Sequence, residues 1–521
     1  MVINLTNNRT TNTVRNIACG IINKIICLII PFFIRTIMIK KMGSEYLGLN
    51  SLFTSILQVL NLTELGFSSA IVFSMYKPIA NNDKKIICAL MNFYKRIYRI
   101  IGVVILTVGL LITPLIPRLI NGSVPKDINI YILYLLYLLN TVITYFLFAY
   151  KSALLNAEQR TDIISNINSV ISIILYITQI IIMITIKNYY LFVVLIGITN
   201  VLNNIVISIV ADKKYPELKC KGEIDKTTKE DIKKRVYGLM IQKICATTRN
   251  SLDSIFLSMF LGLNIVAIYN NYYTIMNGVI SILSILTSSM IASIGNSIVT
   301  DSIQKNYKDL EKFNFIYMWI SGFCTIFMLC EYQTFMKLWM GEKFLFPMTS
   351  VVLFCIYFYL LKVGDILSSY YQATGLWYEG KYRAFAETIL NIILNYILGK
   401  FFGVNGIICA TIISLFLINF LYGSTIIFKY YFKGISPLGY FSKHFLYFFS
   451  TLLSCVVTYY FCNFISFGNM IDLLLKAIIC LIVPNVIFLI IYMKNEQFLE
   501  SKRFILNFIR GKMKKYKKRE N

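Results

Sequence analysis

Ionisable side chains inside long apolar stretches are the residues of this sequence that could do chemistry. In the first such stretch, Lys24 and Arg35 are eleven residues apart, about three helical turns, and would share one face with Leu28 and Pro31. A charge among apolar side chains is costly, so such residues are functional candidates by default. Two cations on one stripe suit an anionic ligand such as a diphosphate.

A lysine in a later apolar stretch suggests a paired site. Lys243 follows Lys24 at the spacing of an internal repeat, and the symmetry of that repeat could bring both lysines to one cleft. We expect this pair to bind the diphosphate. In the alternative interpretation both lysines extend to nearby lipid headgroups, and Arg35 anchors the opposite surface close to Lys40 and Lys41.

Carboxylates inside the apolar stretches are candidates for exchanging H⁺ or Na⁺. Arg249 and Asp253 are four residues apart, so they can form an intrahelical ion pair, and Arg249 is also a candidate ligand for the anion. Lys362 and Asp365, three apart, can pair in the same way. In the functional alternative, a carboxylate moves an ion with the field, which supplies about 2.3 kcal/mol per charge per 100 mV. The candidates are Glu64, Asp253, Asp365 and Glu387.

Two further motifs have a functional and a structural interpretation. Tyr269, Asn270 and Tyr273 could stack on sugars and form hydrogen bonds with them, but tyrosine is also common at membrane interfaces. Glu64 lies just before a run of small residues that begins at Gly66, and such a run also favours close helix packing.

The composition indicates what positions these side chains. Of 521 residues, 57% are hydrophobic and 15% charged, and the mean hydropathy is +0.67, whereas soluble domains are roughly 45–50% apolar. Apolar stretches of about 20 residues recur along the whole chain, which predicts an all-α integral membrane protein. The twelve cysteines show no CxxC and have a single histidine, His444, so we expect reduced structural thiols and no metal site.

Charge placement predicts the topology. The net charge is +26, but the basic residues lie between apolar spans and not in a domain suited to nucleic acid. With the N-terminus inside, most of the 51 Lys and Arg residues fall in cytoplasmic segments, so we expect both termini to be cytoplasmic. We expect about 14 transmembrane helices, which begin near residues 17, 46, 98, 128, 163, 189, 237, 264, 315, 348, 384, 404, 441 and 471.

An internal repeat divides the chain. At an offset of 219, NKIIC at residues 23–27 falls on QKICA at 242–246, and Gly43 falls on Gly262. At an offset of 216, ALLNAEQR at 153–160 falls on SYYQATGL at 369–376. Two pseudo-symmetric six-helix lobes in the same orientation follow, with a charged cytoplasmic linker between them. The predicted parts are lobes at 1–211 and 236–432, the linker at 212–235, two further helices at 433–495 and a basic tail at 496–521.

The stretch Met42–Ala80, with YLGLN, ELG and YKP, resembles the polysaccharide-exporting flippases, the Wzx-like branch of the multidrug/oligosaccharidyl-lipid/polysaccharide exporter superfamily. The stretches Asp127–Arg160 and Tyr269–Val279 are similar to the same proteins. The resemblance implies a MATE-like fold with two additional C-terminal helices and alternating access driven as an antiporter by H⁺ or Na⁺, without another cofactor. It implies a polyprenyl-diphosphate-linked oligosaccharide as cargo, a bacterial cytoplasmic membrane, and a polysaccharide polymerase and glycosyltransferases as partners.

The cargo explains why a protein is needed. Each sugar hydroxyl moved into hydrocarbon without a partner costs roughly 4–8 kcal/mol, so an oligosaccharide does not cross unaided. The alternatives are a drug or cation exporter of the same superfamily, a membrane glycosyltransferase or polymerase, and a scaffold protein. An enzyme would need a catalytic carboxylate or metal site in a sizeable outer domain, and the outer loops are short, so we expect no enzyme.

Overall fold

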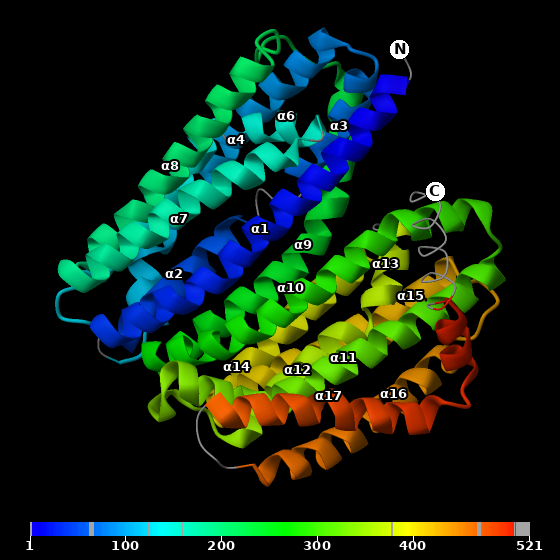
Figure 1. Cartoon of the computed structure of the whole chain (residues 1–521). Coiled ribbons are helices and arrows are strands. Elements are labelled where there is room, and N and C mark those ends of the chain that lie inside the picture. The colour runs from blue at the N-terminus through cyan, green and yellow to red at the C-terminus, as the bar shows by residue number, and fades with distance from the viewer. Residues whose placement is uncertain are drawn as a thin grey trace, which may run out of the picture. The chain divides into compact units, whose positions relative to one another are not determined.

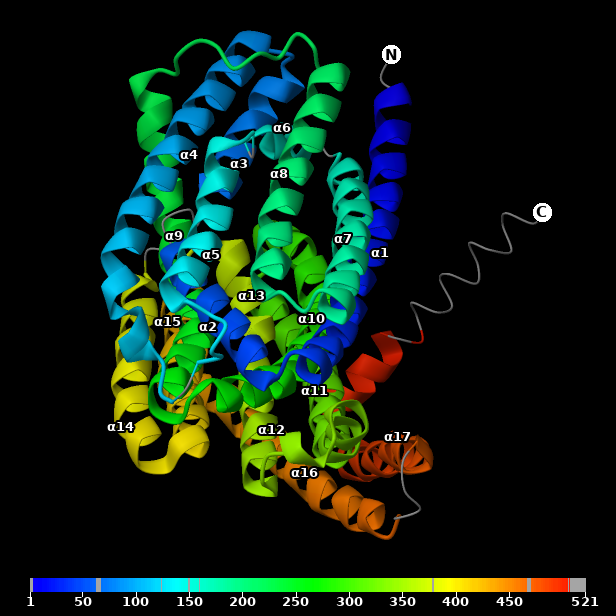
Figure 2. The same ribbon diagram turned by 90° about the vertical axis from the view of Figure 1, so that its left-hand side faces the viewer.

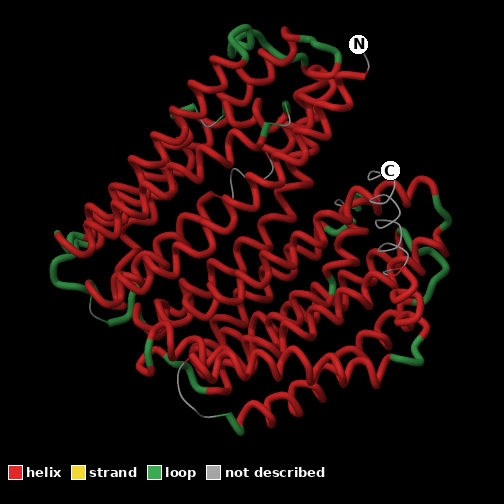
Figure 3. Tube along the Cα trace, in the orientation of Figure 1, coloured by secondary structure: helices red, strands yellow, loops and turns green. Residues whose placement is uncertain are grey.

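The computed structural model describes residues 3–61, 67–122, 124–148, 150–158, 160–376, 379–465, 470–504 and 506, and these residues are almost entirely helical (Figure 3). Contacts divide the chain into two compact units, Met1–Tyr269 and Asn270–Asn521. We describe each unit by itself. The lobes predicted from the internal repeat, with their linker at 212–235, remain a prediction.

Unit 1 is a bundle of long helices around a core of aliphatic and tyrosine side chains (Figures 1 and 2). Within it, α1 packs along α7, α7 on α8, α8 on α5, and α2 on α9. The buried tyrosines keep their hydroxyls satisfied: Tyr134 donates to the carbonyl of Gly109 at 3.1 Å and Tyr137 to Asn50 at 2.6 Å. The elements are α1 (Ile3–Lys41), α2 (Ser44–Leu60), α3 (Phe67–Ala80), α4 (Lys84–Ile112), the short helix η2 (Thr113–Leu119), α5 (Ile130–Phe146), α6 (Lys151–Ala157), α7 (Thr161–Thr185), α8 (Tyr189–Lys214), α9 (Lys226–Leu261) and the start of α10 (Leu263–Thr300).

Unit 2 is built around the long helix α11, which contacts α12, α16 and α17. Its core is aromatic: Phe315 and Trp319 of α11 pack against Tyr447, Phe488 and Tyr492. The elements after α10 are α11 (Ile303–Met340), η3 (Glu342–Phe344), α12 (Met348–Val363), α13 (Asp365–Thr374), α14 (Lys381–Ser414), the π-helical segment η4 (Leu415–Tyr422), α15 (Gly423–Tyr430), α16 (Pro437–Asn463) and α17 (Met470–Tyr492).

Several helices begin well before the apolar residues that predicted them. α4, α9 and α11 start at residues 84, 226 and 303, whereas hydropathy gave starts near 98, 237 and 315. The N-cap residues explain the difference, because the side chains of Asp83, Asp225 and Ser302 accept from backbone N–H groups of the first turn. The helix thus starts in a polar segment, and only its later turns are apolar enough for a bilayer.

A tight reversal divides α14 into a hairpin. Gly403 has φ 57° and ψ −131°, a conformation open mainly to glycine. Across this turn, the amide nitrogen of Asn391 lies 3.2 Å from the hydroxyl of Thr411 and 3.3 Å from that of Ser414. Twenty residues of straight helix would span about 30 Å, so the two arms must lie side by side. The helices expected near 384 and 404 are the arms of this hairpin.

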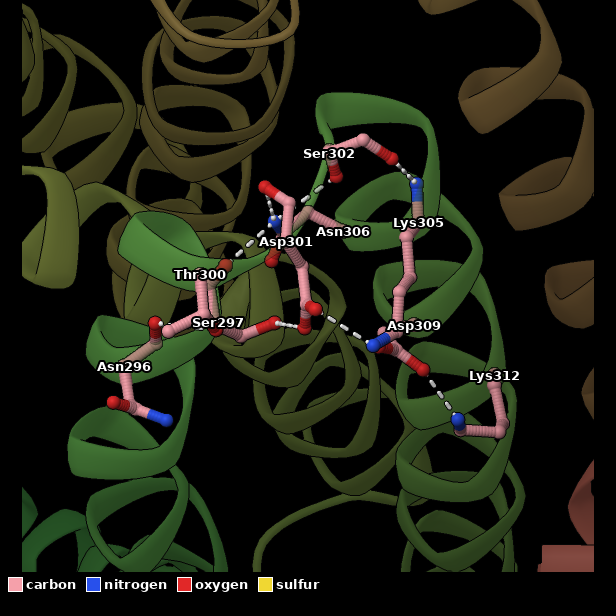
Figure 4. A network of polar contacts seen from close by, with 9 residues as sticks. All are labelled: Asn296, Ser297, Thr300, Asp301, Ser302, Lys305, Asn306, Asp309 and Lys312. Carbon is pink, nitrogen blue, oxygen red and sulfur yellow. Dashed lines mark hydrogen bonds and ion pairs between the residues drawn. The ribbon is translucent and has the colours of Figure 1, made fainter.

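The loop from α10 to α11 is held by polar contacts (Figure 4). Asp301 accepts from Lys305 Nζ at 2.7 Å and from Ser297 Oγ at 2.9 Å. The Asn306 amide donates to the carbonyls of Ser297 and Ser302 at 3.0 and 3.1 Å. The bonds from Lys305 and Ser297 stabilise the carboxylate and lower the pKa of Asp301.

Among the residues that the structure describes, nine helices are long and apolar enough to cross a membrane, and the bent pair α5–α6 would make ten. One of these spans, Tyr382–Tyr430, contains the α14 hairpin. The prediction of an all-α, multi-pass membrane protein is confirmed.

Candidate substrate-binding site

A membrane span of unit 2, Met348–Thr374, is interrupted at Gly364, between α12 and α13, and an ion pair bridges this break in the helix. Lys362 lies in the last turn of α12 and Asp365 in the first turn of α13, so each charge complements the dipole of its own helix end. Lys362 Nζ donates to Asp365 Oδ2 at 2.6 Å, and Tyr317 Oη of α11 donates to the same oxygen at 2.6 Å. The predicted intrahelical pair is present, but it joins two half-helices.

The break also exposes backbone groups, which side chains satisfy. Tyr440 of α16 donates to the Val363 carbonyl at the end of α12, at 3.4 Å. Inside a membrane, irregular backbone persists only where protein or a cavity surrounds it, and broken helices commonly form transporter binding sites. The Lys362–Asp365 ion pair therefore lies at an interruption of a membrane helix, which is where transporters commonly bind their ligands.

An apolar cavity of about 560 Å³ lies beside this break, lined by α11, α12, η4 and α16. Val363, next to Lys362 in the chain, is part of its wall. Among the described residues that line it, none is a carboxylate, and its polar members are hydroxyls, thiols and His444. His444 Nε2 lies 3.0 Å from the amide nitrogen of Asn314.

The cavity reaches the outer surface of unit 2. Phe445, one of its lining residues, is 65% exposed, and Phe416, Phe448 and Leu452 are exposed as well. In a membrane such side chains face hydrocarbon. The cavity can therefore accept an apolar chain laterally from the bilayer.

The α14 hairpin buries a second polar group. Glu387 is 2% exposed, and Asn391 and Asn395 follow on the same face of the first arm. Asn391 donates to Thr411 and Ser414 on the second arm, and Asn395 donates to Asn391 at 3.1 Å. A buried carboxylate beside hydroxyl and amide oxygens suits a hard monovalent cation or a proton.

Unit 1 contains a third buried polar group, on α9. Tyr269 Oη donates to Asp253 at 2.9 Å, and both residues are almost fully buried. Arg249 is buried one turn before Asp253 on the same helix. Ser251 links the helix to α2 through Gln58 at 3.1 Å. The predicted neighbours Asp253, Arg249 and Tyr269 thus lie on adjoining elements of one unit.

The other predicted residues are placed less closely together. Lys24 is exposed on α1, and Arg35 is half-buried three turns later on the same helix. Asn270 and Tyr273 are half-buried in α10. Lys243 belongs to α9, but its side chain lies outside the described part of the chain, and so does all of Glu64.

The interruptions of the helices were not predicted from the sequence. At the offset of 216, Gly364 corresponds to Phe148, which has a positive φ of 55° and lies at the bend between α5 and α6. A buried lysine lies close to this bend too, since Lys151 begins α6 and pairs with Asp212 of α8. Each unit therefore has a bent or broken span with a lysine–aspartate pair near it.

No known protein family and no curated protein matches this chain by sequence. Solved structures match it by fold. The lipid II flippase MurJ in an inward closed conformation has a TM-score of 0.65 and 17% identity over 93% of this chain and 99% of that one. An inward-facing multidrug resistance MATE family transporter of the MOP superfamily has a TM-score of 0.60 and 14% identity over 75% and 92% of the two chains. A Vibrio cholerae MATE transporter has a TM-score of 0.52 and 13% identity over 80% and 97%.

This chain has the MurJ and MATE transporter fold. The resemblance seen in Met42–Ala80 is confirmed at that level, and the expected MATE-like architecture is present. The MurJ match covers more of the chain than the MATE matches do.

Proposed function

We propose that this protein is a flippase that moves a polyprenyl-diphosphate-linked oligosaccharide repeat unit from the inner to the outer leaflet of a bacterial cytoplasmic membrane, for surface polysaccharide synthesis. The observation that carries the proposal is the apolar cavity of unit 2, which reaches the hydrocarbon-facing surface and lies beside the Lys362–Asp365 pair. An amphipathic ligand with a long apolar chain and an anionic head fits such a combination.

The proposed cargo needs a polar and an apolar environment at the same time. The sugar hydroxyls and the diphosphate require polar partners throughout the crossing, whereas the polyprenyl chain is most stable in an apolar environment. In the proposed mechanism the cavity of unit 2 holds part of the chain, and Lys362 of the same unit binds the diphosphate. The cations proposed from the sequence, Lys24, Arg35, Lys243 and Arg249, belong to unit 1 and remain separate candidates for the diphosphate. Tyr269, Asn270 and Tyr273 remain proposed sugar ligands.

Ion coupling is part of the same proposal. Glu387 is the carboxylate that we favour as the H⁺ or Na⁺ site, because it is buried next to amide and hydroxyl groups on both arms of the hairpin. Asp253, which accepts a hydrogen bond from Tyr269, and Asp365, which pairs with Lys362, remain alternative candidates. Glu64 stays a sequence-based candidate. A polymerase and glycosyltransferases that make and consume the cargo are the proposed partners.

A drug or cation exporter is the second candidate, and the MATE matches favour it. A cationic drug would require an anionic group in its pocket. The lack of a carboxylate among the described residues lining the cavity makes this candidate the weaker one.

This proposal can be tested by filling the apolar cavity with a larger side chain. Cys455 of α16 lines it, and its neighbour Val456 does not and is 62% exposed. We expect Cys455→Phe to lower flipping of a fluorescent lipid-linked oligosaccharide in proteoliposomes by about tenfold, the effect of roughly 1.4 kcal/mol. Val456→Phe adds the same ring toward lipid and should leave flipping unchanged.

Two results would reject the proposal. One is equal flipping by both variants. The other is a wild-type protein that moves no lipid-linked oligosaccharide in vesicles but lowers the accumulation of a cationic dye in cells, which would establish the exporter.

A further inference from the structure

Three cysteines that are far apart in the sequence meet inside unit 2. Cys330 comes from α11, Cys462 from the end of α16 and Cys480 from α17. Their sulfur atoms all lie within 4.8 Å of one another, and all three residues are buried. They are free thiols. Each of the three helices that pack together at this place thus contributes one sulfur atom.

A carboxylate beside the thiols lacks a partner. Glu331, the residue after Cys330, is 5% exposed, and neither of its carboxylate oxygens has a hydrogen-bond partner among the residues that the structure describes. A buried carboxylate without hydrogen-bond partners is costly, and a cation bound at the neighbouring thiols would offset part of that cost.

We propose that Cys330, Cys462 and Cys480 form a structural Zn²⁺ site that fastens α16 and α17 to α11, with the Glu331 carboxylate as a nearby negative charge. Three cysteine thiolates occur in common ligand sets of structural zinc sites, and a fourth ligand, here a water molecule, completes the tetrahedron. A zinc–sulfur bond of about 2.3 Å sets the sulfur atoms roughly 3.8 Å apart in a tetrahedron, so a small inward movement completes the site. On binding, the three thiols release their protons to solvent.

The charges favour Zn²⁺ over Cu⁺. Three thiolates and the nearby Glu331 carboxylate carry four negative charges in a buried place, and Zn²⁺ balances more of this charge than Cu⁺ does. Lys476 of α17 lies near Glu331 and donates to Thr334 of α11 at 3.0 Å. Its charge reduces the net negative charge of three thiolates and a nearby carboxylate around one Zn²⁺.

The experiment measures metal in the full-length protein, purified in detergent with a reductant. Mass spectrometry of the elements should give one Zn²⁺ per chain. After metal removal and addition of Co²⁺, thiolate-to-cobalt absorption bands should appear in the near ultraviolet. Cys330→Ser and Cys480→Ser should lose both signals, and Glu331→Gln, which keeps the side-chain shape, should weaken zinc binding about tenfold or more.

Cys324→Ser is the matched control, because Cys324 lies on α11 outside the cluster. It should keep the full zinc content and the cobalt spectrum. Zinc should also raise the thermal unfolding temperature of the wild type and of Cys324→Ser, but not of Cys480→Ser.

Three outcomes would overturn the proposal. The first is a protein that takes up neither Zn²⁺ nor Co²⁺. The second is zinc retention by both cluster variants. The third is a disulfide between two of the three cysteines in protein alkylated directly in membranes, which would assign the cluster to redox chemistry. These outcomes leave the flippase proposal untouched, since that proposal is tested at Cys455.

Discussion

Lys362 and Asp365 carry opposite charges inside a membrane span, where burying either charge alone would cost free energy. The Lys362 side chain is 6% exposed and that of Asp365 is 28% exposed. Their ion pair connects the ends of two half-helices, and Tyr317 adds a further bond to the aspartate. The pair can be structural, or Lys362 can exchange Asp365 for a substrate phosphate.

Removing one partner separates these roles. Lys362→Met should lower the free energy of unfolding by about 2 kcal/mol, less than the roughly 3–5 kcal/mol of a fully buried pair because Asp365 is partly exposed. The double variant Lys362→Met/Asp365→Asn removes both charges and should recover most of that stability. If Lys362 binds phosphate, flipping stays low in the double variant, and thermal unfolding together with the vesicle assay measures both effects.

The exposed pair Lys305–Asp301 is the control for this cycle. Because both groups contact solvent, Lys305→Met should leave both the stability and the flipping activity nearly unchanged. Full recovery of flipping in the Lys362/Asp365 double variant would show that the lysine has only a structural role.

At single positions, the sequence indicated which side chains are buried but only partly what they touch. Lys362 and Asp365 could be paired from a spacing of three, and Asp253 could be placed on a buried helix face. The Tyr269–Asp253 bond was not predicted, although both residues were candidates. The cysteine cluster had no sequence signal, because Cys330 and Cys462 are brought together only by the packing of α11 on α16.

At the scale of helices, one close approach in unit 1 sets how α2 packs. Gly48 of α2 faces the start of α10, and a Cβ atom there would lie 2.2 Å from the Leu263 carbonyl oxygen. Backbone atoms cannot move aside as the end of a side chain can, so α2 and Leu263 would have to separate.

Gly48→Ala should therefore destabilise the protein by about 1–3 kcal/mol, as overpacking does, despite the better helix propensity of alanine. Gly20→Ala on α1 is the control, because a Cβ atom at Gly20 meets nothing within 4 Å. That change should be neutral or stabilise by up to about 1 kcal/mol. Thermal unfolding of the purified variants measures both, and equal effects would contradict the close contact.

Hydropathy predicted most membrane spans but not their ends or interruptions. The apolar run that predicts α11 starts near 315, but the helix extends to Ser302 because that side chain caps it. The breaks near Phe148 and Gly364 do not interrupt the apolar pattern, so periodicity alone passes over them. The turn at Gly403 was anticipated only as a boundary between two expected helices.

At the scale of the whole chain, the large positive charge is distributed over short polar connections, and one of these packs on a helix end. The connection from α8 to α9 lies against α4: Glu217 pairs with Lys84, Glu223 with Arg96 at 2.8 Å, and Asn92 donates to the Gly222 carbonyl at 2.8 Å. The two ion pairs lower the pKa of Glu217 and of Glu223.

Lowered carboxylate pKa values fix the direction of the pH effect. The contribution of these pairs is complete above the ordinary glutamate pKa of about 4.3 and is lost as the pH falls through the lower folded values. We expect the backbone of residues 215–225 to exchange amide hydrogen faster, relative to its intrinsic rate, below about pH 4. Glu217→Gln/Glu223→Gln should show the faster exchange already at neutral pH, and an unchanged variant would contradict the docking.

The overall fold class, the membrane character and the MATE-like architecture followed from composition, charge placement and the Met42–Ala80 motif. This was possible because each membrane span must be apolar and because the basic residues lie between the spans. The shape of the cavity could not be predicted. Phe445 and Val456 are both apolar residues of α16, and only the structure shows that Phe445 lines the cavity and Val456 does not.

The π-helical segment Leu415–Tyr422 forms one wall of the cavity through Phe416 and Phe420. A π turn holds one more residue than an α turn, and one residue of helix corresponds to about 100° of rotation and 1.5 Å of rise. Deleting one residue from Leu415–Tyr422 would remove this surplus and turn the aromatic rings by about 100° relative to the helix that follows. The shape of this cavity wall therefore depends on a single extra residue in the chain.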